Sequence, residues 1–223
     1  MKPSPPTERF LLHHAVKSRS FRILWLLEEA QTPYAVSLHD FTKATQKDAS
    51  FLALNPDGKV PVVVDRGPDG SWSAVVTESV AICAYVADAL PQAALAPAVS
   101  SPQRAAYMTW LAYYGSSFEP AFADTVFPRQ GDVPRSALGW SSFDLVVSRV
   151  ARGVEPGPWL LGNHFSAADI LYGSMLHWLQ AWGKLPPNES LARYLTAIQQ
   201  RDGWKRAQGK EAEMTQNASL VTS

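Results

Sequence analysis

Thr77-Glu78-Ser79 is the segment whose residue types most directly suggest binding chemistry. It joins an apolar, strand-like run to a segment with helical spacing that begins at Ser79. A helix start offers unpaired N–H groups and a partial positive charge, and both favour an anion. The alternative is that Ser79 only caps the helix, a role worth about 1 kcal/mol. On this segment alone, capping is the favoured interpretation.

A turn that leads into a strand stands just before this segment. Asn55-Pro56-Asp57-Gly58 has turn composition, and Pro61 begins the apolar run that continues to Val64. Proline does least harm to pairing at the first residue of a strand, where its missing N–H is least needed. From these residues alone, an ordinary strand that begins with proline is favoured over a binding element.

Ser166 and Asp169 have the spacing of a helix cap. Ser166 would cap a helix start, and Asp169, three residues on, would reach back in a variant of the capping box. Phe165 and Ile170 suit a hydrophobic staple around the same cap. The role of this motif is folding and not catalysis.

Strands and helices alternate over the first ninety residues. The apolar patterns predict strands and helices at Arg9–His13, Arg19–Ala30, Tyr34–Leu38, Thr42–Leu54 (weakly helical), Pro61–Val64 and Ala74–Val76, followed by a helix from Ser79. Prolines at positions 91, 97 and 102 then resist both kinds of structure and indicate a linker.

Beyond the linker, the pattern predicts helices only. They are expected at 107–122, 136–152, 166–182, 188–201 and 204–214, the last two completing a bundle, with a frayed tail over 215–223. Strand–helix units followed by helices alone predict a small α/β domain joined to an all-α bundle.

Composition excludes several classes of protein. Of 223 residues, 46% are hydrophobic and 18% charged, which is enough apolar surface for a core and argues against a disordered chain. Twenty basic residues balance twenty acidic ones, so no basic excess indicates nucleic acid.

Apolar runs stay far below the roughly 20 residues that cross a membrane, and the N-terminus lacks a signal-peptide core. The single cysteine, Cys83, reads as a buried small hydrophobe, and no Cys/His cluster has metal-ligand spacing, so we expect a soluble, cytoplasmic protein without a metal.

Together these motifs resemble those of the glutathione transferase family. Bacterial and fungal members often read His-x-x-x-Ser-Arg-Ser followed by Arg-Ile-Leu-Trp-Leu-Leu-Glu-Glu, and residues 14–29 follow this pattern closely. The resemblance implies a thioredoxin-like, glutathione-binding domain over 7–90. It also implies an all-helical domain over 102–215 that contributes the electrophile site, and a homodimer.

The resemblance also implies which residues hold glutathione. Val60-Pro61 matches the family's cis-proline dipeptide, beside Lys59, so the backbone of Val60 would pair with the cysteinyl part of glutathione as an added strand. Ser79 would hold the γ-glutamyl carboxylate by its hydroxyl and backbone N–H, and Glu78 would face the ammonium group.

Ser18 is the residue that would activate the thiol, because the family places this group in the loop after the first strand. That loop holds neither tyrosine nor cysteine, so the resemblance implies a serine-type enzyme. A free thiol has a pKa of about 8.5, and a hydroxyl that donates to sulfur stabilises the thiolate, as does a helix N-terminus. Arg19 and Ser20 are candidates for support of the thiolate, and whether Ser18 or Ser20 contacts the sulfur stays open.

An aromatic band on the first helix of the bundle is the candidate electrophile pocket. Its residues have helical spacing typical of core positions, yet the family sets its pocket beside this helix, so Tyr107, Trp110 and Tyr114 are expected to line it. The expected function is conjugation of glutathione, as co-substrate, to small hydrophobic electrophiles. The alternatives are a non-catalytic interaction module of the same fold, and a glutathione-dependent isomerase or peroxidase.

Overall fold

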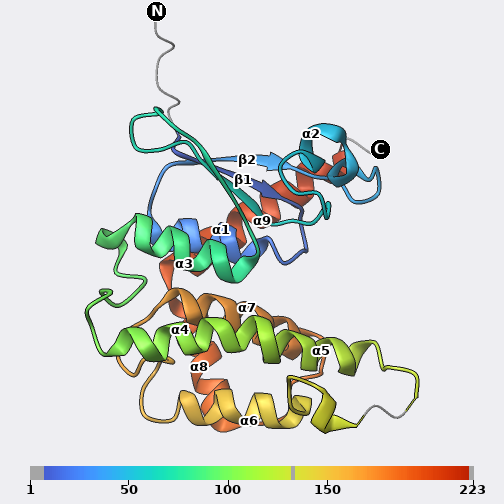
Figure 1. Cartoon of the computed structure of the whole chain (residues 1–223), viewed down its shortest axis with the longest axis vertical. Coiled ribbons are helices and arrows are strands. Elements are labelled where there is room, and N and C mark those ends of the chain that lie inside the picture. The colour runs from blue at the N-terminus through green and yellow to red at the C-terminus, as the bar shows by residue number, and fades with distance from the viewer. Residues whose placement is uncertain (1–7, 132–133, 221–223) are drawn as a thin grey trace, which may run out of the picture. The chain divides into compact units, whose positions relative to one another are not determined.

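The computed structural model describes residues 8–131 and 134–220, which form two compact units (Figure 1). The first unit holds the described residues up to Ala93 together with those from Gln200 onward, and the second holds Ala94–Gln199. The predicted combination of a thioredoxin-like α/β fold and a helical bundle is confirmed.

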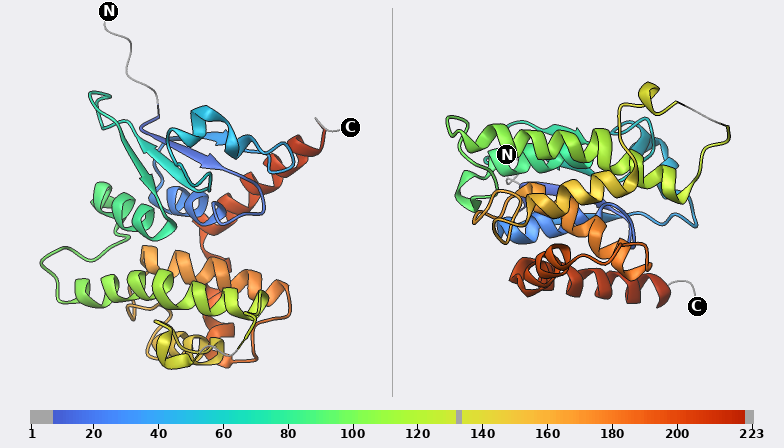
Figure 2. Two further views of the ribbon diagram at one scale, coloured as in Figure 1. Left: turned by 45° about the vertical axis from the view of Figure 1, so that its right-hand side comes forward. Right: turned by 90° about the horizontal axis from the view of Figure 1, so that it is seen from below.

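A four-stranded mixed sheet is the centre of the first unit (Figure 2). Its strands are β1 (Phe10–His14), β2 (Tyr34–Leu38), β3 (Val62–Asp65) and β4 (Ala74–Thr77), in the spatial order β2-β1-β3-β4. The pair β1/β2 is parallel and therefore needs a helical crossover, whereas β3 runs antiparallel to both β1 and β4.

Helix α1 (Phe21–Ala30) supplies this crossover and is almost completely buried. Nine of its ten residues are buried, Arg22 and Glu28 among them. Burial on so many sides follows because the helix contacts β1, α3 (Ser79–Ala89) and α9 (Asp202–Leu220). Between β2 and β3 the chain forms only the short helices η1 (Thr45–Lys47) and α2 (Ala49–Leu52), and η2 (Pro91–Ala93) follows α3.

The second unit is helical throughout its regular elements. These are α4 (Gln103–Tyr113), a π-helical stretch η3 (Tyr114–Phe118), α5 (Glu119–Val126), η4 (Arg135–Ala137), α6 (Phe143–Gly153), α7 (Ala167–Ala181) and α8 (Glu189–Gln200). Its core gathers around the ring of Tyr172, which lies 5.0 Å from that of Tyr114 and 5.2 Å from that of Phe118. The predicted capping box is present at the start of α7, where the Ser166 N–H donates to the Asp169 carboxylate at 2.9 Å.

Two predictions in the second unit were wrong in their boundaries. The helix expected over 107–122 is divided into α4, η3 and α5 and runs on to Val126. The helix expected from residue 136 begins only at Phe143, because Ser142 has an extended backbone and residues 135–137 form no more than a short turn.

The last helix is the largest departure from the sequence-based prediction. It was expected to complete the bundle and to fray from residue 215, but α9 continues to Leu220 and belongs to the first unit. Trp204 explains the docking, since its ring packs edge-on against Phe21 at 5.3 Å and against Trp25 at 4.8 Å. Residues 221–223 lie outside the described part of the chain. The domain bounds 7–90 and 102–215 stay a prediction.

Candidate functional site

Three motifs of the sequence lie at one end of the sheet. In the register of the sheet, His13 pairs with Val62, and Val62 pairs with Thr77. The loop that follows β1, the residues that precede β3 and those that follow β4 therefore leave the sheet at the same end. These are the segments that contain Ser18, Val60-Pro61 and Glu78-Ser79.

The loop between β1 and α1 holds Ser18 at a half-buried position. Its hydroxyl lies 2.7 Å from the Ala15 carbonyl oxygen and 2.7 Å from Ser20 Oγ, and it accepts the Ser20 N–H at 3.2 Å. The Ser18 carbonyl in turn accepts the Phe21 N–H at 3.1 Å. Ser18 is thus fixed directly before the first turn of α1, where the positive end of the helix dipole lies.

Ser20 differs from Ser18 in being fully buried. The helix begins one residue later than Ser20, which is its N-cap, so the start predicted at Arg19 was early. The Ser20 hydroxyl accepts the Ala15 N–H at 3.0 Å and lies 2.8 Å from His14 Nδ1. Arg19 is exposed. The structure therefore distinguishes Ser18, which is half-buried, from Ser20, whose hydroxyl is held within the interior.

Sequence reasoning missed His14 and Glu211 as members of this network. The Nε2 atom of His14 lies 2.8 Å from Glu211 Oε2, and Glu211 also accepts the Lys17 N–H at 2.6 Å. A signal for His14 exists in the sequence. Residues alternate between the two faces of a strand, so His14 continues the face of Phe10 and Leu12, which are also fully buried. No local signal marks Glu211.

The peptide bond Val60-Pro61 is cis, as the resemblance implied. The preceding turn is fixed by Asn55, whose side-chain amide donates to the Lys59 carbonyl at 2.8 Å. Gly58 has φ +61°, and a Cβ at this position would meet the Gln46 carbonyl at 2.9 Å, so glycine is required there. Lys59 is exposed and Val60 is half-buried.

Glu78 has a backbone conformation that residues other than glycine rarely adopt. Its φ is 65° and its ψ is 122°, immediately before α3 begins at Ser79. Such a conformation costs about 1–3 kcal/mol and is concentrated at binding sites, where the strain presents a side chain or backbone group to a ligand. Glu78 is exposed and Ser79 half-buried, so both residues are accessible.

Two parts of the chain match two family descriptions. Residues 9–88 match "Glutathione S-transferase, N-terminal domain", and residues 133–197 match "Glutathione S-transferase, C-terminal domain". The chain belongs to the glutathione S-transferase family. Among solved structures, a ternary complex of BphK, a bacterial glutathione transferase, is 30% identical with a TM-score of 0.74, over 91% of this chain and 99% of that one.

Other glutathione transferases extend the comparison. A sphingomonad glutathione S-transferase complexed with glutathione is 27% identical, with a TM-score of 0.69, over 91% of this chain and 98% of that one. The disulfide-bond oxidoreductase YfcG of Escherichia coli is 27% identical over 77% of this chain and 79% of its own. The relatives of this chain therefore include a protein named for disulfide chemistry as well as proteins named as transferases.

The aromatic residues proposed for the electrophile pocket lie on α4 and at the start of η3. Tyr107 and Tyr114 are buried, and the Tyr114 hydroxyl donates to Glu119 at 2.7 Å. Trp110 is half-buried, with its ring 5.6 Å from that of Tyr172. These contacts belong to the interior of the second unit, and a role of the three residues in binding an electrophile stays a prediction.

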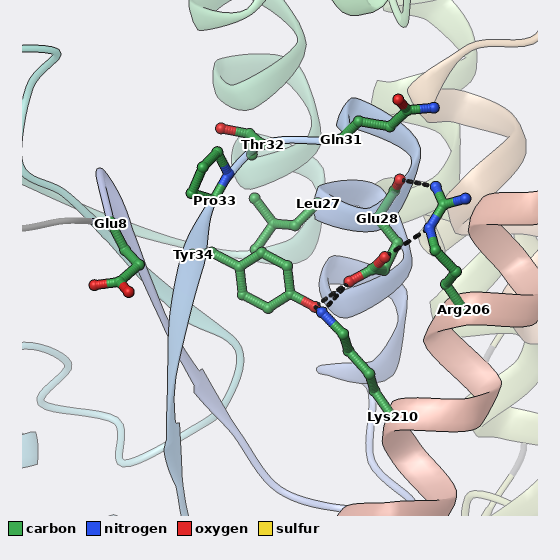
Figure 3. Close-up of a pocket in the computed structure, with 9 residues that line it drawn as sticks. All are labelled: Glu8, Leu27, Glu28, Gln31, Thr32, Pro33, Tyr34, Arg206 and Lys210. Atoms are coloured by element: carbon green, nitrogen blue, oxygen red, sulfur yellow. Dashed lines mark hydrogen bonds and ion pairs between the residues drawn. The ribbon is translucent and has the colours of Figure 1, made fainter.

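A pocket between α1, β2 and α9 lies apart from these motifs (Figure 3). Its centre is Glu28, which is bound by Tyr34, Arg206 and Lys210. Burial would raise the pKa of the Glu28 carboxyl, but the bonds from Lys210, Tyr34 and Arg206 together hold it below its usual value. The charges of the pocket are therefore satisfied within the protein, and their effect is to fix α9 on α1.

In residues 8–131 and 134–220, no helix is long and apolar enough to cross a membrane. Within the same part of the chain, no three His, Cys, Asp or Glu side chains gather closely enough to hold a metal ion.

Proposed function

We propose that this protein is a serine-type glutathione transferase that conjugates glutathione to small hydrophobic electrophiles. The observation that supports it is the meeting, at one end of the sheet, of the Ser18 loop, Val60-Pro61 and Glu78-Ser79. Each segment matches a different part of the tripeptide: its thiol, its cysteinyl backbone and its γ-glutamyl end.

Ser18 is the proposed donor to the glutathione sulfur. Ser18 is half-buried and lies before the start of α1, so a hydrogen bond and a helix dipole would act together on the thiolate. Lowering the thiol pKa by two units requires about 2.7 kcal/mol, which is within the range of one charge-assisted hydrogen bond plus the dipole. Arg19 is a further candidate for support of the thiolate.

Glutathione itself would be held by Glu78-Ser79, where β4 passes into α3, and by the strand-like segment before β3. The Val60 backbone would pair with the cysteinyl part, flanked by Lys59 and Pro61. Ser79 would bind the γ-glutamyl carboxylate at the start of α3, and Glu78 would face the ammonium group. We also propose a cytoplasmic homodimer, and an electrophile site to which Tyr107, Trp110 and Tyr114 contribute.

Reduction of disulfides by glutathione is a second candidate, favoured by the similarity to a disulfide-bond oxidoreductase. The protein's own thiol is unsuited to such chemistry, because Cys83 is fully buried and burial raises its pKa to about 12. Glutathione thiolate would therefore have to be the nucleophile in both reactions, and the same site would serve both.

The experiment combines a binding measurement with two activity assays. Calorimetry should show glutathione binding in the micromolar to millimolar range, roughly −4 to −8 kcal/mol. Two rates are then compared, both measured with glutathione. One is the rate of conjugation to a general aromatic electrophile and the other is the rate of reduction of a small disulfide, and the faster reaction is the dominant activity. Absence of binding at about 10 mM glutathione would exclude both reactions and favour a non-catalytic member of the fold.

A further inference from the structure

The hydroxyl of Ser18 is one end of a chain of polar atoms that runs into the interior and ends on α9. Ser18 Oγ lies 2.7 Å from Ser20 Oγ, which lies 2.8 Å from His14 Nδ1, and His14 Nε2 lies 2.8 Å from Glu211 Oε2. Ser20 and His14 are fully buried. Two hydroxyls, an imidazole and a carboxylate in series are a route along which a proton can move.

Each hydroxyl has more than one acceptor within reach, since the Ala15 carbonyl lies 2.7 Å from Ser18 Oγ and 3.1 Å from Ser20 Oγ; the relay uses Ser20 Oγ and His14 Nδ1 as the acceptors. With His14 neutral and its proton on Nε2 beside the carboxylate, Nδ1 accepts the Ser20 O–H. Ser20 Oγ then accepts the Ala15 N–H and the Ser18 O–H, which fills its two lone pairs. Ser18 Oγ accepts the Ser20 N–H and keeps one lone pair for a further donor. Glutathione, at the proposed site, would supply that donor as its thiol.

We propose that His14 takes up the proton of the glutathione thiol through Ser18 and Ser20, and that Glu211 stabilises the imidazolium that results. This inference rests on the proposed function, since it requires the thiol to lie beside Ser18. The S–H bond breaks and an H–Oγ bond forms at Ser18. The former Ser18 proton passes to Ser20, and the former Ser20 proton forms the Nδ1–H bond of His14. No electrons are exchanged, and the products are a thiolate and an imidazolium.

The same atoms satisfy one another after the transfer. His14 Nδ1–H now donates to Ser20 Oγ, which still accepts the Ala15 N–H. The Ser20 O–H donates to Ser18 Oγ, which still accepts the Ser20 N–H. The Ser18 O–H is then directed to the thiolate. In both states each hydroxyl of Ser18 and Ser20 donates one hydrogen bond, and His14 Nδ1 keeps its bond to Ser20. The Ala15 carbonyl, 2.7 Å from Ser18 Oγ and 3.1 Å from Ser20 Oγ, is the acceptor that competes for these two protons.

Glu211 acts on His14 by charge and not by transfer of a proton. Its oxygen lies off the line of the Nε2–H bond, so the 2.8 Å contact is an ion-pair distance without the angle of a straight hydrogen bond. At this distance the negative charge of Glu211 faces the buried imidazole of His14 directly. His14 and Glu211 are thus positioning and proton-accepting groups that act through Ser20 and Ser18.

The position of Glu211 depends on the docking of α9 along α1. Arg206 and Lys210 on the same helix bind Glu28, and Figure 3 shows both cations directed at that carboxylate. The positive charges of Arg206 and Lys210 are therefore paired with the carboxylate of Glu28. The side chain of Lys17 is exposed, and its backbone N–H donates to Glu211 at 2.6 Å.

His13 belongs to a separate pair. It precedes His14 on β1, and its Nδ1 lies 2.9 Å from His39 Nε2. Among the charged groups that the structure describes, Glu211 is the one within ion-pair distance of His14.

The decisive measurement counts protons when glutathione binds at neutral pH. Thiolate is measured by its ultraviolet absorbance, and protons released to the buffer by calorimetry in buffers of different protonation enthalpy. A free thiol near neutral pH is mostly protonated, so thiolate made without an internal acceptor must release about one proton. With His14 as the acceptor, the parent protein forms thiolate while it releases far less than one proton per thiolate.

Two variants and one control accompany this measurement. His14→Gln is expected to lower thiolate and the conjugation rate about tenfold at neutral pH, with recovery above the pKa of the free thiol. Glu211→Gln keeps an acceptor for the Lys17 N–H but removes the charge, and it is expected to lower the rate about fivefold. Glu213→Gln, on an exposed position of the same helix, should leave the rate unchanged.

The outcomes separate this inference from the proposed function. Release of one proton per thiolate by the parent protein would overturn the proton relay and leave glutathione activation by Ser18 intact. The same conclusion would follow if Glu211→Gln and Glu213→Gln behaved alike at every pH. Failure to bind glutathione at all would overturn the proposed function and the relay together.

Discussion

Ser18→Ala tests the centre of the proposed site. The substitution removes the hydroxyl of the half-buried residue before α1 and leaves the segments that contain Val60 and Glu78 unchanged. One charge-assisted hydrogen bond to a thiolate is worth about 1.5–3 kcal/mol, which corresponds to a rate loss of roughly ten- to a hundredfold at neutral pH. Affinity for glutathione should change little, because the backbone and γ-glutamyl contacts remain.

Ser20→Ala is the matched comparison, and its expected cost falls on stability as well as rate. The Ala15 N–H is buried and donates to the Ser20 hydroxyl at 3.0 Å, so the alanine variant removes the acceptor of a buried donor. This loss is worth about 1–3 kcal/mol of unfolding free energy. The donor to sulfur is kept, but the path to His14 is interrupted, so the rate should fall less than in Ser18→Ala.

The assay is the pH profile of conjugation to an aromatic electrophile, together with urea unfolding of each variant. The defect of Ser18→Ala should shrink above the pKa of the free thiol, where thiolate forms without help. A normal rate for Ser18→Ala with a crippled Ser20→Ala would assign the sulfur donor to Ser20 and refute our reasoning from accessibility. Normal rates for both variants would mean that backbone N–H groups or Arg19 activate the glutathione thiol.

Three further predictions concern binding and stability. Glu78→Gly should raise the unfolding free energy by up to about 1 kcal/mol by relieving the positive φ, while calorimetry shows weaker glutathione binding. Burial, and then the nearby His39, lower the pKa of His13 to about 4, whereas an unfolded histidine titrates near 6.5. The unfolded state therefore binds the proton first, so stability in urea unfolding should fall by up to about 3 kcal/mol from pH 7 to pH 4, and His13→Phe should flatten this slope. Asp169→Ala should cost about 3 kcal/mol in the same measurement without changing glutathione affinity, because it leaves the buried N–H groups of Leu160 and Ser166 without their acceptor.

Several elements of the first unit were predictable because they depend on a local pattern. Tyr34–Leu38 and the start of the helix at Ser79 coincide with the structure, and both are marked by a neighbouring proline or by a change in apolar spacing. The grouping of Ser18, Val60 and Glu78 at one end of the sheet was implied by the family resemblance. The structure adds the strand register that brings their segments together.

The position of α9 in the first unit could not be predicted from local patterns. Its sequence is strongly polar, and the contacts that fix it join residues far apart in the chain. Arg201 binds Glu29 through two hydrogen bonds of 2.8 Å, and Arg206 binds Glu28 at 2.9 Å. Helical spacing predicts that α9 is a helix but carries no information on which acidic residues face it.

The charges of α9 are better understood as partners for polar groups buried in the first unit. Glu28 on α1 is almost fully buried, and a buried charge without a partner is strongly destabilising. Arg206 and Lys210, one helical turn apart, neutralise Glu28, and Glu211 reaches His14 from the next position. A helix with this composition would be marginal by itself, so its order up to Leu220 follows from these contacts. The C-terminal segment that sequence analysis assigned to the bundle and a frayed tail is therefore the segment that places Glu211 beside His14 in the proposed relay.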